Sequence, residues 1–126
     1  MLRTTAAAVL AATLLATGTS VPATAGDNDE RIRRGGCSGP ADWKMKVKAD
    51  DGRIEVEAEV DSNVNGQTWR WRLSHNGSVS ARGRNVTRAP SGSFDVERRM
   101  TNLGGTDRFR FRATHGDQVC RGRIRW

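Results

Sequence analysis

Arginine occupies every second position in two short segments near the end of the sequence, 108–112 and 121–125. In a β-strand such alternation places the side chains on one face. A short turn at 115–118 would set the two strands side by side, and the sequence predicts the opposed pairs Arg108–Arg125, Arg110–Arg123 and Arg112–Arg121. Guanidinium groups bind phosphates and carboxylates through paired hydrogen bonds. We therefore expect an anion-binding face made of Arg70, Arg72, Arg108, Arg110, Arg112, Arg121, Arg123 and Arg125.

The distribution of charge supports this expectation. The 126 residues carry a formal net charge of +7. Residues 67–126 hold 13 basic and 4 acidic side chains, net +9, whereas residues 26–66 hold 7 basic and 10 acidic ones, net −3. The partner predicted for the arginine face is an anionic polymer or surface: a cell-wall phosphate polymer, DNA or an anionic lipid surface. The alternative is a solvated face without a ligand, partly neutralised by Asp95 and Glu97, which prevents aggregation at sheet edges.

Catalysis is not predicted. The two histidines, His75 and His115, fall in turns that an antiparallel fold places at opposite ends, so they cannot share a metal or act together. Glutamates 55, 57 and 59 alternate along one strand and have lysine partners on the strand before, and no pair of carboxylates flanks a cleft. The expected protein is a binding protein with no catalytic residue, no metal and no cofactor.

Tryptophan supplies a rival hypothesis. Exposed tryptophans in a β-sandwich can stack on sugar rings, which would make the protein a carbohydrate-binding module. However, Trp43, Trp69, Trp71 and Trp126 all share the parity of core positions, and the chain has three phenylalanines and no tyrosine with which to fill a core. Burial of the tryptophans is therefore favoured. A protein-binding or inhibitory scaffold is the other alternative, and the sequence contains no pattern that tests it.

The beginning of the sequence has the layout of a secretory signal peptide. A basic start is followed by an apolar run at 6–16 and by small residues, Ala-Thr-Ala, at 23–25. The run is too short for a membrane-spanning helix, which needs about 20 residues. We expect a signal peptide at 1–25, a disordered polar leader at 26–36 and one domain at 37–126. The product should be secreted and monomeric, with no transmembrane segment.

Two cysteines, Cys37 and Cys120, lie near the two ends of the predicted domain. Export to an oxidising compartment favours a disulfide between them. Two free thiols or a metal-binding pair are the alternatives, and neither cysteine has further ligand residues nearby in the sequence.

Alternation of apolar and polar residues continues through the predicted domain and indicates β-strands. Asp51-Gly52 is typical of a two-residue hairpin loop, which predicts the pairs Lys48–Glu55, Lys46–Glu57, Lys44–Glu59, Val47–Val56 and Trp43–Val60. At 75–77 we expect a three-residue loop that sets Leu73 opposite Val79. Seven short strands and no helix predict an antiparallel β-sandwich of immunoglobulin-like type, closed by one disulfide.

Three stretches carry a family resemblance: DGRIEVE at 51–57, NGQTW at 65–69 and APSGSF at 89–94. They resemble those of uncharacterised small secreted immunoglobulin-like β-sandwich proteins of actinobacteria, and the likeness includes both cysteines. The resemblance implies export, a β-sandwich and a disulfide. It implies no activity.

Overall fold

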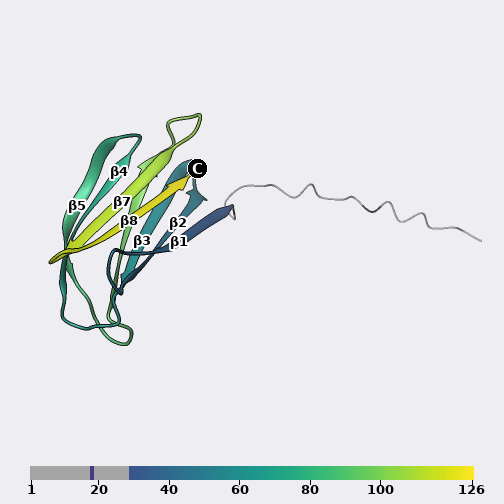
Figure 1. Ribbon diagram of the computed structural model, residues 1–126. Helices are drawn as coiled ribbons and strands as arrows, with labels where there is room; N and C mark the ends of the chain where they lie inside the picture. Colours follow the sequence, from purple (N-terminus) through teal and green to yellow (C-terminus); the bar gives the residue numbers. More distant parts are fainter. Residues whose placement is uncertain (1–17, 19–28) are drawn as a thin grey trace, which may run out of the picture.

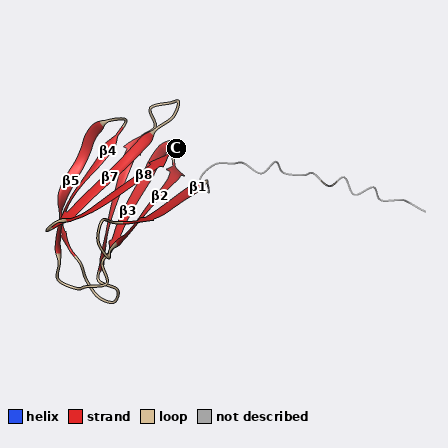
Figure 2. Cartoon of the chain, in the orientation of Figure 1, coloured by secondary structure: helices blue, strands red, loops and turns tan. Residues whose placement is uncertain are grey.

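Eight β-strands form the protein in a computed structural model that describes Gly18 and residues 29–126 (Figures 1 and 2). The predicted signal peptide and the start of the predicted leader lie outside these residues, apart from Gly18. The strands are β1 (Glu30–Gly36), β2 (Asp42–Asp50), β3 (Arg53–Asp61), β4 (Thr68–His75), β5 (Ser78–Val86), β6 (Ser93–Thr101), β7 (Arg108–His115) and β8 (Gln118–Arg125). The described part of the chain contains no helix of the length and apolarity that a membrane span requires.

The strands make two antiparallel sheets. Sheet A has the order β1-β2-β3-β6, and sheet B has the order β5-β4-β7-β8. Apolar side chains from both sheets fill the space between them, with Trp69, Phe109 and Phe111 among the largest that are fully buried. The predicted all-β, two-sheet antiparallel architecture is confirmed. The predicted strand count of seven is wrong, because the described residues contain eight strands.

The additional strand is β1, which lies in the segment predicted to be a disordered leader. It pairs with β2 along its whole length, from Glu30–Lys48 to Gly36–Asp42. The segment has no apolar alternation because nearly all its side chains are exposed. A strand at the edge of a sheet gains its stability from the backbone ladder, and its sequence need not contain a buried face. The prediction of disorder is therefore wrong for residues 30–36.

The hairpin β2–β3 has the predicted register. Asp51 and Gly52 both have positive φ, at 48° and 76°, and form the two-residue loop. All five predicted pairs occur: Lys48–Glu55, Lys46–Glu57, Lys44–Glu59, Val47–Val56 and Trp43–Val60. Charges of opposite sign lie on the outer face and apolar groups on the inner face, so a slip by one residue would expose the apolar set.

The hairpin β4–β5 differs from the prediction. Its loop has two residues, Asn76 and Gly77, both at positive φ, as a type I′ turn requires. The register then shifts between Leu73 and Ser74, so that Leu73 lies opposite Ala81 and not Val79. A bulge adds one residue to one strand. It sets an apolar residue, Ala81, opposite Leu73 without the three-residue loop.

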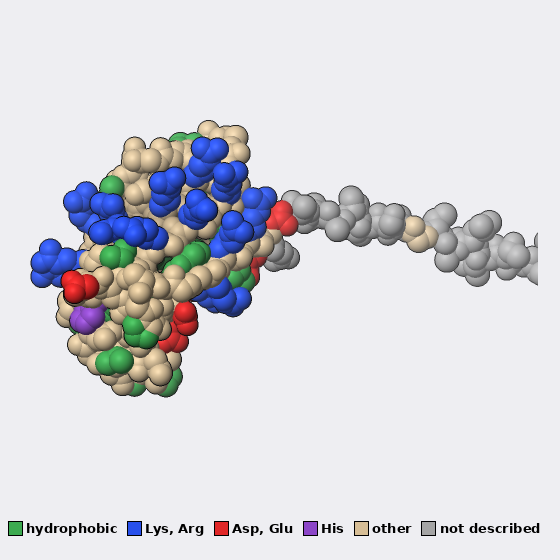
Figure 3. All heavy atoms as spheres, in the orientation of Figure 1, with side chains coloured by type: hydrophobic (Ala, Val, Ile, Leu, Met, Phe, Trp, Pro, Cys, Tyr) green, Lys and Arg blue, Asp and Glu red, His purple; other side chains and the backbone are tan. Residues whose placement is uncertain are grey.

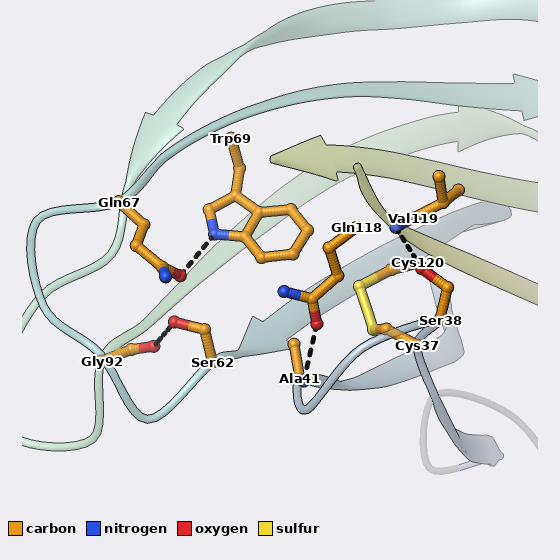
Figure 4. Close-up of a disulfide and its surroundings, with 10 residues drawn as sticks. All are labelled: Cys37, Ser38, Ala41, Ser62, Gln67, Trp69, Gly92, Gln118, Val119 and Cys120. Carbon is orange, nitrogen blue, oxygen red and sulfur yellow. Dashed lines mark hydrogen bonds between the residues drawn. A yellow bond between two sulfur atoms is a disulfide. The ribbon is translucent and has the colours of Figure 1, made fainter. Parts of the chain in front are cut away.

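The predicted disulfide joins Cys37 to Cys120 (Figure 4). Cys37 follows β1 directly, and Cys120 is buried in β8. Two hydrogen bonds hold the same junction: the Val119 N–H donates to Ser38 Oγ at 2.8 Å, and the Ala41 N–H donates to the side-chain oxygen of Gln118 at 2.7 Å. The bridge therefore fixes the end of β1 to sheet B.

Candidate anion-binding site

The predicted arginine pairs form the outer face of the β7–β8 hairpin. The Cα partners are Arg108–Arg125, Arg110–Arg123 and Arg112–Arg121. Strand β4 lies on the other side of β7, where Arg72 is opposite Arg112, and β5 adds Arg82 opposite Arg72. A row of four arginines thus crosses all strands of sheet B. The side chain of Arg112 is half-buried, and those of Arg72, Arg82 and Arg121 are exposed.

The other predicted member, Arg70, lies one pair away from this row. It is opposite Arg84 of β5 and Thr114 of β7, and its side chain is exposed. Arg82 and Arg84 were not predicted as site residues. Their alternation with Ala81 and Gly83 along β5 is the sequence signal that could have identified them.

Among the described residues, no carboxylate forms an ion pair with this face. Asp95 and Glu97, which the sequence offered as counter-charges, belong to β6 and pair with Glu59 and Glu57 of sheet A. The ion pairs among the described residues are Lys46–Glu57, Lys48–Glu55, His75–Asp107 and Arg99–Asp50. None of them includes an arginine of the outer face of sheet B. The two sheets therefore differ in charge: the outer face of sheet A is mixed, and that of sheet B is basic.

Two hollows run over the basic face. The larger has a volume of about 970 Å³ and the smaller about 550 Å³. Both are lined by Arg33, Arg110 and Arg123, so they adjoin each other. Figure 3 shows Lys and Arg side chains gathered over the face where Figure 1 places β7, β8 and β1. The arginines thus line a concave surface.

The floor of the larger hollow includes Trp43, which is partly buried. Gly35 and Gly122 lie against its ring: a Cβ added at Gly35 would be 2.7 Å from the ring, and one at Gly122 would be 2.8 Å away. Both distances are shorter than real Cβ contacts allow. Glycine at these two positions therefore permits strands β1 and β8 to close over the tryptophan and shape the hollow.

Sheet A contains the one cluster of possible metal ligands among the described residues. Oxygens of Glu55, Glu57 and Glu97 lie within 4.8 Å of one another. Lys46 and Lys48 pair with two of these carboxylates, at 3.4 and 3.5 Å. The carboxylate of Glu57 also raises the pKa of Lys46, mainly through charge attraction. Because lysines already pair with two of its three carboxylates, we assign no metal to this cluster.

The histidines lie at opposite ends of the β4–β7 pair, as predicted. His75 is near the start of β7, opposite Phe109, and His115 ends β7 with its Nδ1 2.8 Å from the carbonyl oxygen of Thr68. His75 has a partner that the sequence did not suggest: its Nε2 lies 2.6 Å from the fully buried Asp107. The backbone of Asp107 exchanges two hydrogen bonds with Trp126. This buried pair therefore anchors the chain next to β8.

The tryptophans contribute mainly to the core. Trp69 and Trp71 are buried, at 0% and 5% exposure, and Trp43 and Trp126 are partly buried against the same cluster. Arg98 lies at an inward-facing position of β6, and its guanidinium is 5.3 Å from the ring centroid of Trp71. An arginine at this position covers the tryptophan and keeps its charge exposed.

Comparisons with known proteins do not assign this chain to a family. No family model matches the chain, and no curated protein or solved structure matches it either.

Proposed function

We propose that this protein is a secreted, monomeric binding protein, without catalytic activity, that holds a linear phosphate-bearing polymer along the outer face of sheet B. The observation that carries the proposal is the row Arg82, Arg72, Arg112 and Arg121, which crosses four strands without an intervening carboxylate. Like charges directly opposite each other destabilise a sheet. A bound anion removes that cost because it lies between the guanidinium groups.

The spacing of the arginines supports a polymer over a single small anion. Alternate residues along a strand are about 6.8 Å apart, and neighbouring strands are about 4.8 Å apart. A chain with repeated phosphates can contact several guanidinium groups at once, and each phosphate can accept two hydrogen bonds from one of them. The hollowed shape favours a flexible chain over a bilayer, since a flat surface reaches only the rim of a concave site.

The tryptophans give less support to the carbohydrate-binding alternative. Stacking on sugar needs an exposed aromatic face, whereas Trp69 and Trp71 are buried. The disulfide supports an extracellular site of action, because such bonds persist in oxidising compartments.

The strand pairing supports our proposal that the sandwich is immunoglobulin-like. Strand β3 pairs with β6, β4 pairs with β7, and β7 pairs with β8. Immunoglobulin domains join strands B and E, C and F, and F and G in the same way. Strand β1 would then be an addition at the edge of the first sheet.

The proposal is tested with three probes at low salt: a labelled single-stranded oligonucleotide, a glycerol-phosphate wall polymer and anionic lipid vesicles. We expect both polymers to bind. If about five phosphates are contacted, the logarithm of the oligonucleotide affinity should fall with the logarithm of salt concentration at a slope of about −3.5. Binding to vesicles alone, or to no probe, would reject the proposal.

A pair of matched variants locates the site. Arg72→Gln/Arg121→Gln removes two charges from the basic face. Arg53→Gln/Arg88→Gln removes the same charge from positions that line neither hollow. We expect the first variant to lose about tenfold or more in affinity, because each lost charged contact weakens binding several-fold. Equal losses in both variants would show a general charge effect and would contradict the assigned site.

A further inference from the structure

Strand β1 carries two arginines, Arg31 and Arg33, on the side of sheet A that faces sheet B. The register shows this, because Arg31 pairs with Val47 and Arg33 with Met45, both of which are buried in the core. The side chains of Arg31 and Arg33 are nevertheless exposed. Strand β1 therefore lies at the rim of the sandwich, where its inward side reaches solvent instead of the core.

The neighbour of β1 across this rim is β8, the edge strand of sheet B (Figure 1). The two strands lie against each other, but β1 forms its backbone ladder with β2 and β8 forms its own with β7. Arg31 makes the side-chain contacts across the seam: its Nη1 donates to the carbonyl oxygen of Arg125 at 3.2 Å, and its guanidinium lies 5.4 Å from the ring centroid of Trp126.

Arginines from both sheets meet at this seam. The smaller hollow is lined by Arg31 and Arg33 of β1 together with arginines of sheet B, which are Arg108, Arg110, Arg123 and Arg125. Among the described residues, none of these six takes part in an ion pair. The like charges on β1 and on sheet B repel each other, and no backbone ladder joins β1 to β8. A phosphate between them would attract both.

We infer that the β1–β8 seam is the central part of the binding site, where phosphates of the polymer bridge Arg31 and Arg33 to the arginines of β7 and β8. The inference rests on the proposed function and deepens it. It assigns two site residues from outside sheet B. It also predicts that bound phosphate holds β1 to sheet B more firmly than the contacts of Arg31 alone do.

Short-chain inorganic polyphosphate tests the inference, since it offers phosphates without bases or sugars. Arg31→Gln/Arg33→Gln is compared with the charge-matched Arg53→Gln/Arg88→Gln. We expect the β1 variant to lose about tenfold in affinity and the control about twofold, because only the first loses charged contacts to phosphate. Arg33→Gln alone, which leaves the contacts of Arg31 intact, should lose about threefold.

Hydrogen exchange supplies the second measurement. In the unaltered protein, polyphosphate should slow exchange of the amides of residues 30–36 by a larger factor than those of β5. In Arg31→Gln/Arg33→Gln this selective protection should be absent. The comparison also identifies a variant in which β1 has come away from sheet B before any polymer is added.

The outcomes separate the two proposals. If the β1 variant and its control lose affinity equally and β1 gains no protection, the seam is rejected. The proposed function is then still supported by the affinity that the variant Arg72→Gln/Arg121→Gln loses. If polyphosphate and the other polymers fail to bind the unaltered protein at low salt, both proposals are rejected.

Discussion

Arg72 and Arg112 lie directly opposite each other on β4 and β7, two strands that belong to different hairpins. Each also faces another arginine on its far side, Arg82 and Arg121 respectively. The contact between the hairpins therefore brings like charges together at the centre of sheet B. Selection for stability alone would favour an acidic residue at one of these positions.

The first prediction concerns the loss of stability caused by these like charges. Arg72→Glu places a negative charge between two arginines and should stabilise the protein by about 0.5–1 kcal/mol at low salt. Urea denaturation measures the change, and most of the gain should disappear in high salt because the charges are exposed. The same variant should bind polymer more weakly. A loss of stability at low salt would show that the row is not repulsive.

The second prediction concerns the glycines of β1. Gly35→Ala brings a Cβ to 2.7 Å from the ring of Trp43, so the strand or the ring must shift. The expected destabilisation is about 1–3 kcal/mol. Gly36→Ala is the control, because its Cβ would meet nothing closer than 3.9 Å, and it should be close to neutral. Thermal denaturation of both variants would show whether β1 is seated on the tryptophan.

The third prediction concerns the buried pair His75–Asp107. Asp107→Ala leaves His75 without its partner at 2.6 Å and removes the acceptor of the Leu103 N–H. The loss should be about 2–3 kcal/mol. In a double-mutant cycle with His75→Ala, the double variant should lose less free energy of unfolding than the sum of the two single losses. The reason is that either substitution removes the same contact. Additive losses would mean that the two side chains act independently.

The fourth prediction concerns pH. Glu57 raises the pKa of Lys46 in the folded protein above the ordinary lysine value of 10.5. A lysine that binds its proton more tightly in the folded than in the unfolded state stabilises the folded protein below pH 10.5. That contribution is lost as the pH rises through the raised pKa. The pair is partly exposed, so its contribution should be at most about 0.5 kcal/mol. Glu57→Gln should return the pKa of Lys46 toward the ordinary value in an NMR titration.

The fifth prediction concerns the disulfide. The bridge spans 83 positions of sequence. On the chain-entropy model, a loop of this length contributes about 4 kcal/mol of stability by restricting the unfolded chain. Cys37→Ala/Cys120→Ala should therefore lower the free energy of unfolding by about that amount. A much smaller loss would show that the unfolded chain keeps the two ends close without the bond.

Local patterns predicted most of the fold. In β2–β3, opposed charges and apolar groups fix one register, and in β7–β8 the turn at 115–118 fixes the arginine pairs. Strand β1 could not be found in this way, because an edge strand with exposed side chains has no apolar period. Arg31 and Arg33 of this strand were therefore missing from the predicted site. The bulge in β4–β5 was missed because a two-residue loop with a bulge and a three-residue loop without one both set an apolar residue opposite Leu73.

The pairing of His75 with Asp107 could not be predicted for a different reason. The two residues are 32 positions apart, and neither belongs to a recurring motif. Only the packing of β4 against β7 brings them together. The alternative in which Asp95 and Glu97 partly neutralise the arginine face is wrong for the same reason. Their strand, β6, pairs with β3 of the other sheet.

The position of the disulfide gives the protein a mechanical property. A pull on the chain before β1 would open the β1–β2 ladder from its outer end, beginning at the pair Glu30–Lys48. Peeling would proceed one residue at a time and would stop at Cys37. Beyond that point the tension passes through the sulfur–sulfur bond into β8. The segment between the two cysteines, which are 83 positions apart in the sequence, cannot extend under load. A tethered molecule would therefore lengthen by little more than β1 itself and would keep strands β2 to β7 in place.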